Sequence, residues 1–231
     1  MTIDAASVAR HMVRGALKGA LATRDAETGA PYASMALLAT AADGAPLTLI
    51  STLARHTRNL IADPAASLLI DTSNAAGDAA SGGRVSLMGR LIRNDTADTR
   101  SRFLARHPAA AGYADFADFS FWRMDVAAAH LIEGFGRIVP LTGAAMRPAH
   151  GGLARFATVD AEYLPALRLQ CPEVTGFDSE GVDLVIARAG VRLAFSATAL
   201  TAESARDAAA NCLVAYCSAQ QKSIVTGSDR T

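Results

Sequence analysis

The segment at residues 51–60 (Ser-Thr-Leu-Ala-Arg-His-Thr-Arg-Asn-Leu) constrains this chain more than any other part of its sequence. It lies between apolar runs at residues 45–50 and 67–70, so we expect a strand, a turn, a short helix and a returning strand. The start of a helix has unpaired backbone N–H groups and a partial positive charge, which attract anions. The cationic and hydroxyl side chains at this start are Arg55, His56, Thr57 and Arg58. Together they predict a pocket for a phosphate group.

The spacing of apolar residues and turn signals predicts a mainly β fold with a few helices. Short strands follow one another closely, which is typical of an antiparallel barrel. The predicted strands lie at residues 19–23, 32–40, 46–51, 84–93, 120–126 and 130–139. The predicted helices lie at residues 4–18, at 55–62, and from Asp95 or Thr96 to about 106. Pro64 ends the second helix, because the residue before a proline avoids the helical conformation.

The composition changes after Leu141, which predicts two domains joined by a linker. Residues 1–141 form the first domain, and residues 142–153, with three glycines and Pro148, form the linker. Residues 154–231 are predicted to form a small α+β domain. Its predicted elements are a helix at 160–170, strands at 182–188 and 191–196 around an Ala189-Gly190 turn, and a helix at 202–219.

The charge balance, the hydropathy and the cysteine spacing exclude several classes of function. The chain has 22 basic and 22 acidic residues, and this balance argues against a nucleic-acid or membrane-surface partner. It has neither an apolar stretch long enough to span a bilayer nor a signal-peptide core, so we expect a cytoplasmic protein. Cys171, Cys212 and Cys217 lack CxxC spacing and are expected to be reduced thiols rather than metal ligands.

Several sequence pieces occur in the order found in one known group of proteins. Besides residues 51–60, these pieces lie at 19–23, 31–34, 84–90, 103–108, 113–116, 121–124 and 134–138. With them the chain resembles the FMN-binding split-barrel flavoproteins, the superfamily of pyridoxamine 5'-phosphate oxidase. Within it, the chain is most similar to the bacterial heme-utilisation (Hug-type) branch. The resemblance covers roughly residues 5–141, and it implies a split β-barrel of Greek-key type.

The resemblance implies FMN as the cofactor and assigns residues to it. Arg55, His56 and Thr57 would hold the phosphate, with Ser51 and Thr52 touching ribityl or phosphate. The remaining implied cofactor contacts are Ser34, Met35, Asn59 and Arg84. Backbone groups of residues 34–36 would meet the flavin ring edge, Asn59 would cap or brace the turn, and Arg84 would reach a flavin, often that of the second subunit. For Arg55, His56 and Thr57, the alternative is a solvated helix start capped by His56. For Arg84, the alternative is an exposed arginine at the start of a strand.

Three functions follow from the resemblance. The first is an FMN-dependent oxidoreductase that acts on a small molecule as a homodimer, with flavin sites at the subunit interface. The second is heme binding or heme degradation, with His150, His130 or a non-histidine side chain as the candidate axial ligand. The third is a flavin-binding protein without turnover. The charged strand residues and the C-terminal ending of the oxidases are missing, so pyridoxamine phosphate oxidation itself is not expected.

The sequence assigns no catalytic residues. It contains no evident set of nucleophile, base and acid, but flavin chemistry needs none, because the ring carries the electrons. Trp122 has Phe116, Phe119 and Phe121 near it in sequence. Such a cluster is predicted to belong to the core, or else to a dimer interface, rather than to a cofactor stack.

Overall fold

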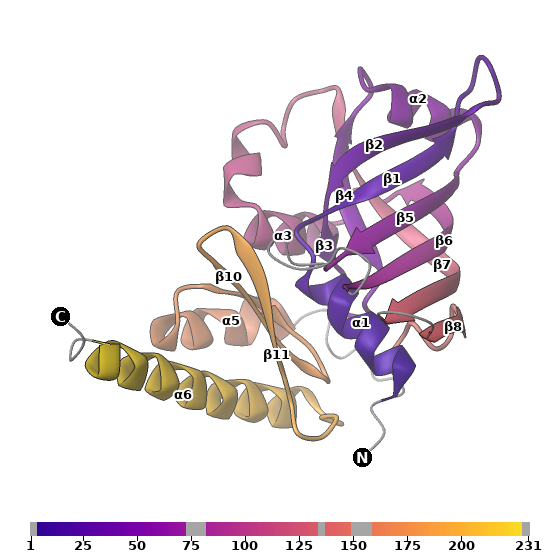
Figure 1. Cartoon of the computed structure of the whole chain (residues 1–231). Coiled ribbons are helices and arrows are strands. Elements are labelled where there is room, and N and C mark those ends of the chain that lie inside the picture. Colours follow the sequence, from indigo (N-terminus) through magenta and orange to yellow (C-terminus); the bar gives the residue numbers. More distant parts are fainter. Residues whose placement is uncertain (1–3, 73–81, 134–136, 149–158, 228–231) are drawn as a thin grey trace. The chain divides into compact units, whose positions relative to one another are not determined.

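The computed structural model describes residues 4–72, 82–133, 137–148 and 159–227. The chain folds as two compact units, Met1–Ala149 and His150–Thr231. Figure 1 shows a curled sheet in the first unit and a small sheet with two helices in the second. The predicted fold class, mainly β with a split barrel followed by a smaller α+β part, is confirmed.

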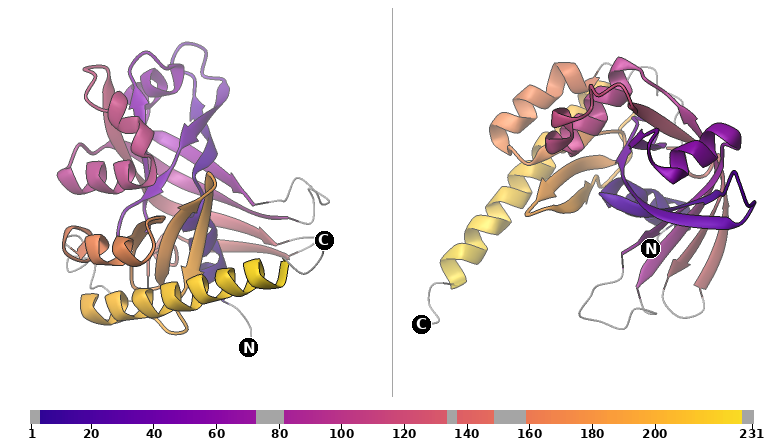
Figure 2. Two further views of the ribbon diagram at one scale, coloured as in Figure 1. Left: turned by 90° about the vertical axis from the view of Figure 1, so that its left-hand side faces the viewer. Right: turned by 90° about the horizontal axis from the view of Figure 1, so that it is seen from above.

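The first unit is an eight-stranded antiparallel sheet in the order β2-β1-β5-β6-β7-β4-β3, with β8 paired to β7. Its strands are β1 (Lys18–Arg24), β2 (Pro31–Leu37), β3 (Ala39–Thr40), β4 (Pro46–Ser51), β5 (Ala65–Asp71), β6 (Gly83–Arg93), β7 (Phe119–Glu133) and β8 (Arg137–Thr142). Its helices are α1 (Ala5–Gly15), α2 (Arg55–Ala62), α3 (Ala97–Arg106) and the short 3-10 helix η1 (Pro108–Gly112). The sheet curls into a half-barrel, seen from above in Figure 2.

Side-chain alternation along the strands fills the concave side of this sheet. Leu21 of β1 pairs with Leu68 of β5, Leu68 with Leu87 of β6, and Leu87 with Ala129 of β7. Paired residues point to the same face of a sheet, and all four are buried. Trp122 joins the same core, as predicted. Phe116 does not, because it is 59% exposed.

Two predicted strand boundaries were wrong. The strand expected at 120–126 and the first part of the one expected at 130–139 form one long strand, β7, whereas residues 137–139 belong to β8. A bulge opposite Met88 and Gly89 allows β7 to bend without ending. Gly89 suits this position, because a Cβ there would lie 2.0 Å from the carbonyl oxygen of Asp125. The strand expected at 32–40 is divided into β2 and β3, where the Leu38 N–H donates to the Leu17 carbonyl instead of a strand partner.

The second unit contains a three-stranded sheet in the order β11-β10-β9. Its elements are α5 (Val159–Gln170), β9 (Val174–Phe177), β10 (Gly181–Ile186), β11 (Ala189–Ala194) and α6 (Ala202–Gly227). The sequence did not predict β9, which is short and contains a glycine. The hairpin turn is at Ala187 and Arg188, two residues before the predicted Ala189-Gly190 turn, and both have positive φ angles, 47° and 66°.

A buried ion-pair cluster stabilises this hairpin. The Arg192 guanidinium of β11 donates to Asp178 at 2.7 Å and to Asp183 of β10 at 3.0 Å. The three cysteines are free thiols, as expected. Within the described ranges, every helix is too short or too polar to cross a membrane.

Candidate functional site

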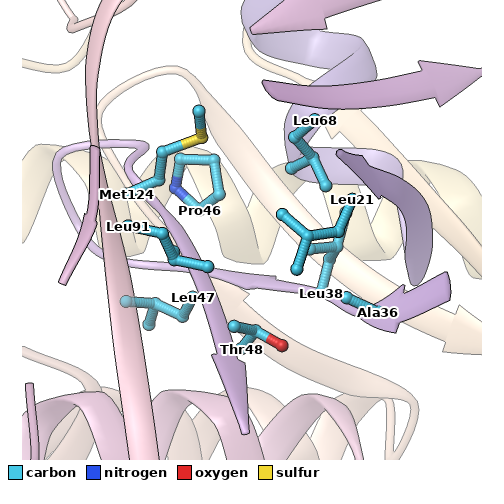
Figure 3. A pocket seen from close by; sticks show the side chains of 9 residues that line it. All are labelled: Leu21, Ala36, Leu38, Pro46, Leu47, Thr48, Leu68, Leu91 and Met124. Carbon is cyan, nitrogen blue, oxygen red and sulfur yellow. The ribbon is translucent and has the colours of Figure 1, made fainter. Parts of the chain in front are cut away.

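The barrel interior of the first unit is too full to hold an organic cofactor. Side chains from several strands converge there in Figure 3. The residues that line the interior are Leu21, Ala36, Leu38, Pro46, Leu47, Thr48, Leu68, Leu91 and Met124. They leave a cavity of about 10 Å³, which is roughly the space for one water molecule. A ligand of flavin or porphyrin size must therefore bind outside the barrel.

A groove of about 540 Å³ lies on the opposite side of the same sheet, over β2, β1 and β5. This volume is within the range of small-molecule sites. The groove is lined by Lys18, Gly19, Ala20, Ala33, Ser34, Met35, Leu69 and Asp71. Met35 is 60% exposed and Leu69 is 40% exposed, so large apolar side chains face solvent here.

Strand pairing extends this groove into one continuous surface, which we call the outer face. Its central row starts at Met35 of β2, which pairs with Ala20 of β1, and Ala20 pairs with Leu69 of β5. The row continues through Leu69–Ser86, Ser86–His130 and His130–Pro140 on β6, β7 and β8. Residues paired in this way share a face. The outer face consists of these residues and their same-face neighbours two positions along each strand.

The charged side chains of the outer face lie in the row next to the central row. Asp71 of β5 pairs with Arg84 of β6, and Arg84 pairs with Ile132 of β7. Lys18 lines the groove at its β1 end. The outer face is therefore an apolar surface with charges along one side.

The start of α2 forms a second cluster of predicted residues, at the end of the β1–β2 hairpin (Figure 1). Arg55 donates through Nε to Asp25 Oδ2 at 2.6 Å, and its guanidinium lies 5.4 Å from the centre of the Tyr32 ring. Hydrogen bonds from Arg55 and then from Thr28 hold the pKa of the Asp25 carboxyl well below its ordinary value. The charge of Arg55, which was predicted to bind a phosphate, is thus already balanced by the carboxylate of Asp25.

His56 and Thr57 have polar atoms that the described residues leave without a partner. His56 Nδ1 lies 2.9 Å from Ser34 Oγ, whereas its Nε2 is buried and has no hydrogen-bond partner among the described residues. Burial lowers the pKa of His56. The hydroxyl of the fully buried Thr57 also has no partner within this part of the chain. His56 does not cap α2, since Ala54 is the N-cap residue and forms no side-chain bond.

Asn59 braces the turn, which is one of the two roles, capping or bracing, that the sequence suggested for it. Its Oδ1 accepts from the Ala26 N–H and its Nδ2 donates to Thr23 Oγ1, both at 3.0 Å. Ser51 Oγ donates to Asp118, whose carbonyl oxygen also accepts from the Thr52 N–H at 2.8 Å. These contacts fix the loop before α2 and tie the helix to the β1–β2 hairpin.

The structure thus divides the predicted site residues between two places. Ser51, Thr52, Arg55, His56, Thr57 and Asn59 lie at or beside α2, while Met35 and Arg84 lie on the outer face. Ser34 belongs to both places, since it lines the groove while its side chain points to the opposite face and contacts His56. Sequence reasoning missed Lys18 and Leu69, which only the strand register brings into the groove.

Of the two histidines considered for heme, His130 is exposed on the outer face and His150 lies outside the described residues. Within the described residues, no group of three or more His, Cys, Asp or Glu side chains could hold a metal ion by itself.

Comparison with known proteins identifies the family. The family model "CREG, beta-barrel" matches residues 2–144, so the chain belongs to the CREG β-barrel family. Over 129 residues it is 36% identical to the chloroplastic non-canonical heme oxygenase HOZ of Arabidopsis thaliana. That match covers 54% of this chain and 39% of the plant protein, so the chain spans well under half of that relative.

Two solved structures match nearly the whole chain. A protein of unknown function from Agrobacterium tumefaciens has a TM-score of 0.74 and 25% identity, with coverage of 90% of this chain and 94% of that one. A heme binding protein from Mycobacterium smegmatis has a TM-score of 0.60 and 28% identity, with coverage of 92% and 97%. The split-barrel part of the predicted resemblance is confirmed, whereas its FMN-binding and Hug-type parts stay predictions.

Replacing Asn59 with alanine is expected to destabilise the first unit. The substitution removes two hydrogen bonds and leaves Ala26 N–H and Thr23 Oγ1 without their partner, which costs about 1–3 kcal/mol. Urea denaturation of the two proteins measures this difference. Arg58→Ala, an exposed change on the same helix, is the control and is expected to alter stability by less than about 0.5 kcal/mol. Equal stabilities of N59A and R58A would contradict the bracing role.

Proposed function

We propose that this protein binds heme on the outer face of its barrel sheet. The observation that carries the proposal is the contrast in free volume between the barrel interior and the groove on the outer face. The interior holds about one water, while the groove over β2, β1 and β5 has a volume of about 540 Å³. Two relatives whose names refer to heme support the choice of ligand.

The residues of the groove fit a porphyrin. Ala20 and Ala33 are small and leave a shallow floor, and Met35 and Leu69 offer exposed apolar contacts for a flat ring. Lys18 lies in the same lining and can pair with a carboxylate of the porphyrin edge. Apolar lining with a few charged groups is the usual composition of a small-molecule site.

The proposal concerns binding rather than turnover, because the plant heme oxygenase is matched over only 39% of its length. Heme would supply its own redox chemistry when bound. The residues of this chain would exclude water from one side of the ring and orient one of its carboxylates toward Lys18.

We also propose that a second copy of the chain covers the outer face, as the resemblance implied. Exposed apolar side chains continue beyond the groove to β8, where Ile138 is 66% exposed. A contiguous apolar patch of this kind usually marks an interaction surface. In such a homodimer the heme would lie between the two sheets.

Leu69→Glu is expected to weaken hemin binding at least about tenfold, or roughly 1.4 kcal/mol. The new carboxylate would lie in the apolar groove and repel the carboxylates of the porphyrin. Ile92→Glu is the matched control, since Ile92 is 43% exposed against 40% for Leu69 but is absent from the groove lining. Hemin titration followed in the Soret region measures both variants, and gel filtration reports their oligomeric state. Equal weakening in L69E and I92E would contradict the outer-face site.

FMN binding at α2 is the second candidate, and a different observation favours it. His56 Nε2 and Thr57 Oγ1 are buried without partners in the described structure, beside a helix start with no side-chain cap. A phosphate could accept hydrogen bonds from both. Ser34 lies on the edge strand β2, lines the groove, and contacts His56 through Oγ on the opposite face of the sheet. A flavin that reaches around this edge could place its ring where we propose the porphyrin. An FMN-dependent oxidoreductase and a flavin carrier both require this arrangement.

The double substitution Arg55→Ala with His56→Ala separates the two candidates. It is expected to abolish FMN retention through gel filtration if α2 holds the phosphate, and to leave hemin affinity within about twofold, since neither residue lines the groove. Arg58→Ala, on the same helix, is the control. Undiminished FMN affinity in the double variant would overturn the phosphate site, and lost hemin affinity would argue against separate ligand sites.

A further inference from the structure

His130 is an exposed imidazole within the apolar part of the outer face. It lies on β7 between Ser86 of β6 and Pro140 of β8, its two cross-strand partners. Side chains in a sheet stand roughly perpendicular to it, and both partners are shorter than histidine. The imidazole therefore projects beyond its neighbours, and no described residue forms a hydrogen bond with it.

Other described histidines are engaged differently. His56 Nδ1 contacts Ser34, and His107 Nε2 lies 2.7 Å from the Leu38 carbonyl oxygen. His11 lies on α1 rather than on the sheet. His130 is thus the histidine of the described chain that the outer face presents to a ligand. Imidazole is also among the commonest protein ligands of heme iron.

The surroundings of His130 suit a flat apolar ring. Its same-face neighbours two positions along β7 are Ala128 and Ile132, and Met88 of β6 pairs with Ala128. Leu69 lies two strands away in the same row, which corresponds to about 10 Å at the usual strand spacing. A porphyrin is wide enough to cover this distance, so it can contact His130 and reach the groove.

Arg84 provides a cation beside this apolar surface. It lies on β6 two residues before Ser86, opposite Ile132 on one side and Asp71 on the other. Arg84 is half-buried and makes no ion pair with any described residue. A guanidinium binds a carboxylate through two parallel hydrogen bonds, which fixes its orientation as well as its position.

We infer that His130 is the axial ligand of the heme iron and that Arg84 binds one propionate of the same heme. This inference rests on the proposed heme function and names the residues of its site. Lys18, in the groove lining, is the cation available to the other propionate.

The test is titration of the purified full-length protein with ferric hemin, followed by absorption spectroscopy. His130→Thr keeps a strand-forming residue at position 130 and removes the ligand. Its affinity is expected to fall at least about tenfold, since even second-sphere partners of metal ligands contribute that much. Its Soret band is expected to move, and free imidazole is expected to restore the wild-type position. His11→Ala removes another exposed histidine and is expected to change neither quantity.

Arg84→Gln tests the second contact separately. It is expected to weaken binding and to reduce its salt dependence, because a charge pair is lost, while the Soret position stays that of the wild type. Circular dichroism checks the fold of each variant, and His130→Asn replaces H130T if the latter does not fold. Resonance Raman spectra of the reduced wild-type complex, with and without ¹⁵N-labelled histidine, supply a readout that needs no variant at position 130.

The outcomes separate this inference from the function on which it rests. Absence of hemin binding by the wild-type protein would overturn both. If the wild-type protein binds hemin, two results would overturn the ligand assignment and leave heme binding in place. One is an unchanged affinity and Soret band in the variants at position 130. The other is the absence of an isotope shift in an iron–histidine band.

Discussion

Alternation of side chains across one curled sheet is the constraint on which the rest of this structure depends. Every second residue of β1, β5, β6 and β7 points inward, and these residues fill the barrel until about one water's space is left. The other half of the residues must then form the surface on which any large ligand binds. The same pairing that packs Leu68 against Leu87 places Leu69 beside Ser86 on the outside. Core and candidate site are therefore two consequences of one register.

The segment at residues 51–60, which the sequence suggested as a phosphate site, also has a structural role. Arg55 is held by Asp25, and Asn59 is committed to Thr23 and Ala26. Both contacts tie α2 to the β1–β2 hairpin. Only the unpartnered atoms of His56 and Thr57 remain to attract an anion among the predicted phosphate contacts of this helix. The remainder of the turn is therefore structural, because its contacts hold α2 against the hairpin.

Local signals were enough to predict part of this structure. The bounds of α2 and β4 agree with the predicted ranges, because Pro64 and the change from apolar to polar residues are visible in the sequence. The predicted position of the turn was wrong by two residues. Alanine and arginine rarely adopt a positive φ, so nothing in the sequence indicates a turn at Ala187 and Arg188. The pairing of Ile186 with Ala189 determines the turn instead. Tertiary pairing also decides that β7 continues past its bulge.

The candidate site shows the same limit. Ser34, Met35 and Arg84 could be selected from the sequence, but only strand order shows that Met35 and Arg84 share a face from which Ser34 points away. Lys18 and Leu69 carry no motif of their own. Their place in the groove depends on pairing between strands that are distant in sequence, such as β1 with β5.

The most direct test of an outer-face heme site is methyl NMR of the protein with ¹³C-labelled methionine methyl groups, before and after addition of diamagnetic zinc protoporphyrin. Met35 lines the groove and Met88 lies on the outer face, whereas Met124 lines the barrel interior. The porphyrin ring current is predicted to shift the methyl signals of Met35 or Met88 and to leave Met124 nearly unchanged. A large shift of Met124 with no change at Met35 and Met88 would contradict binding on the outer face.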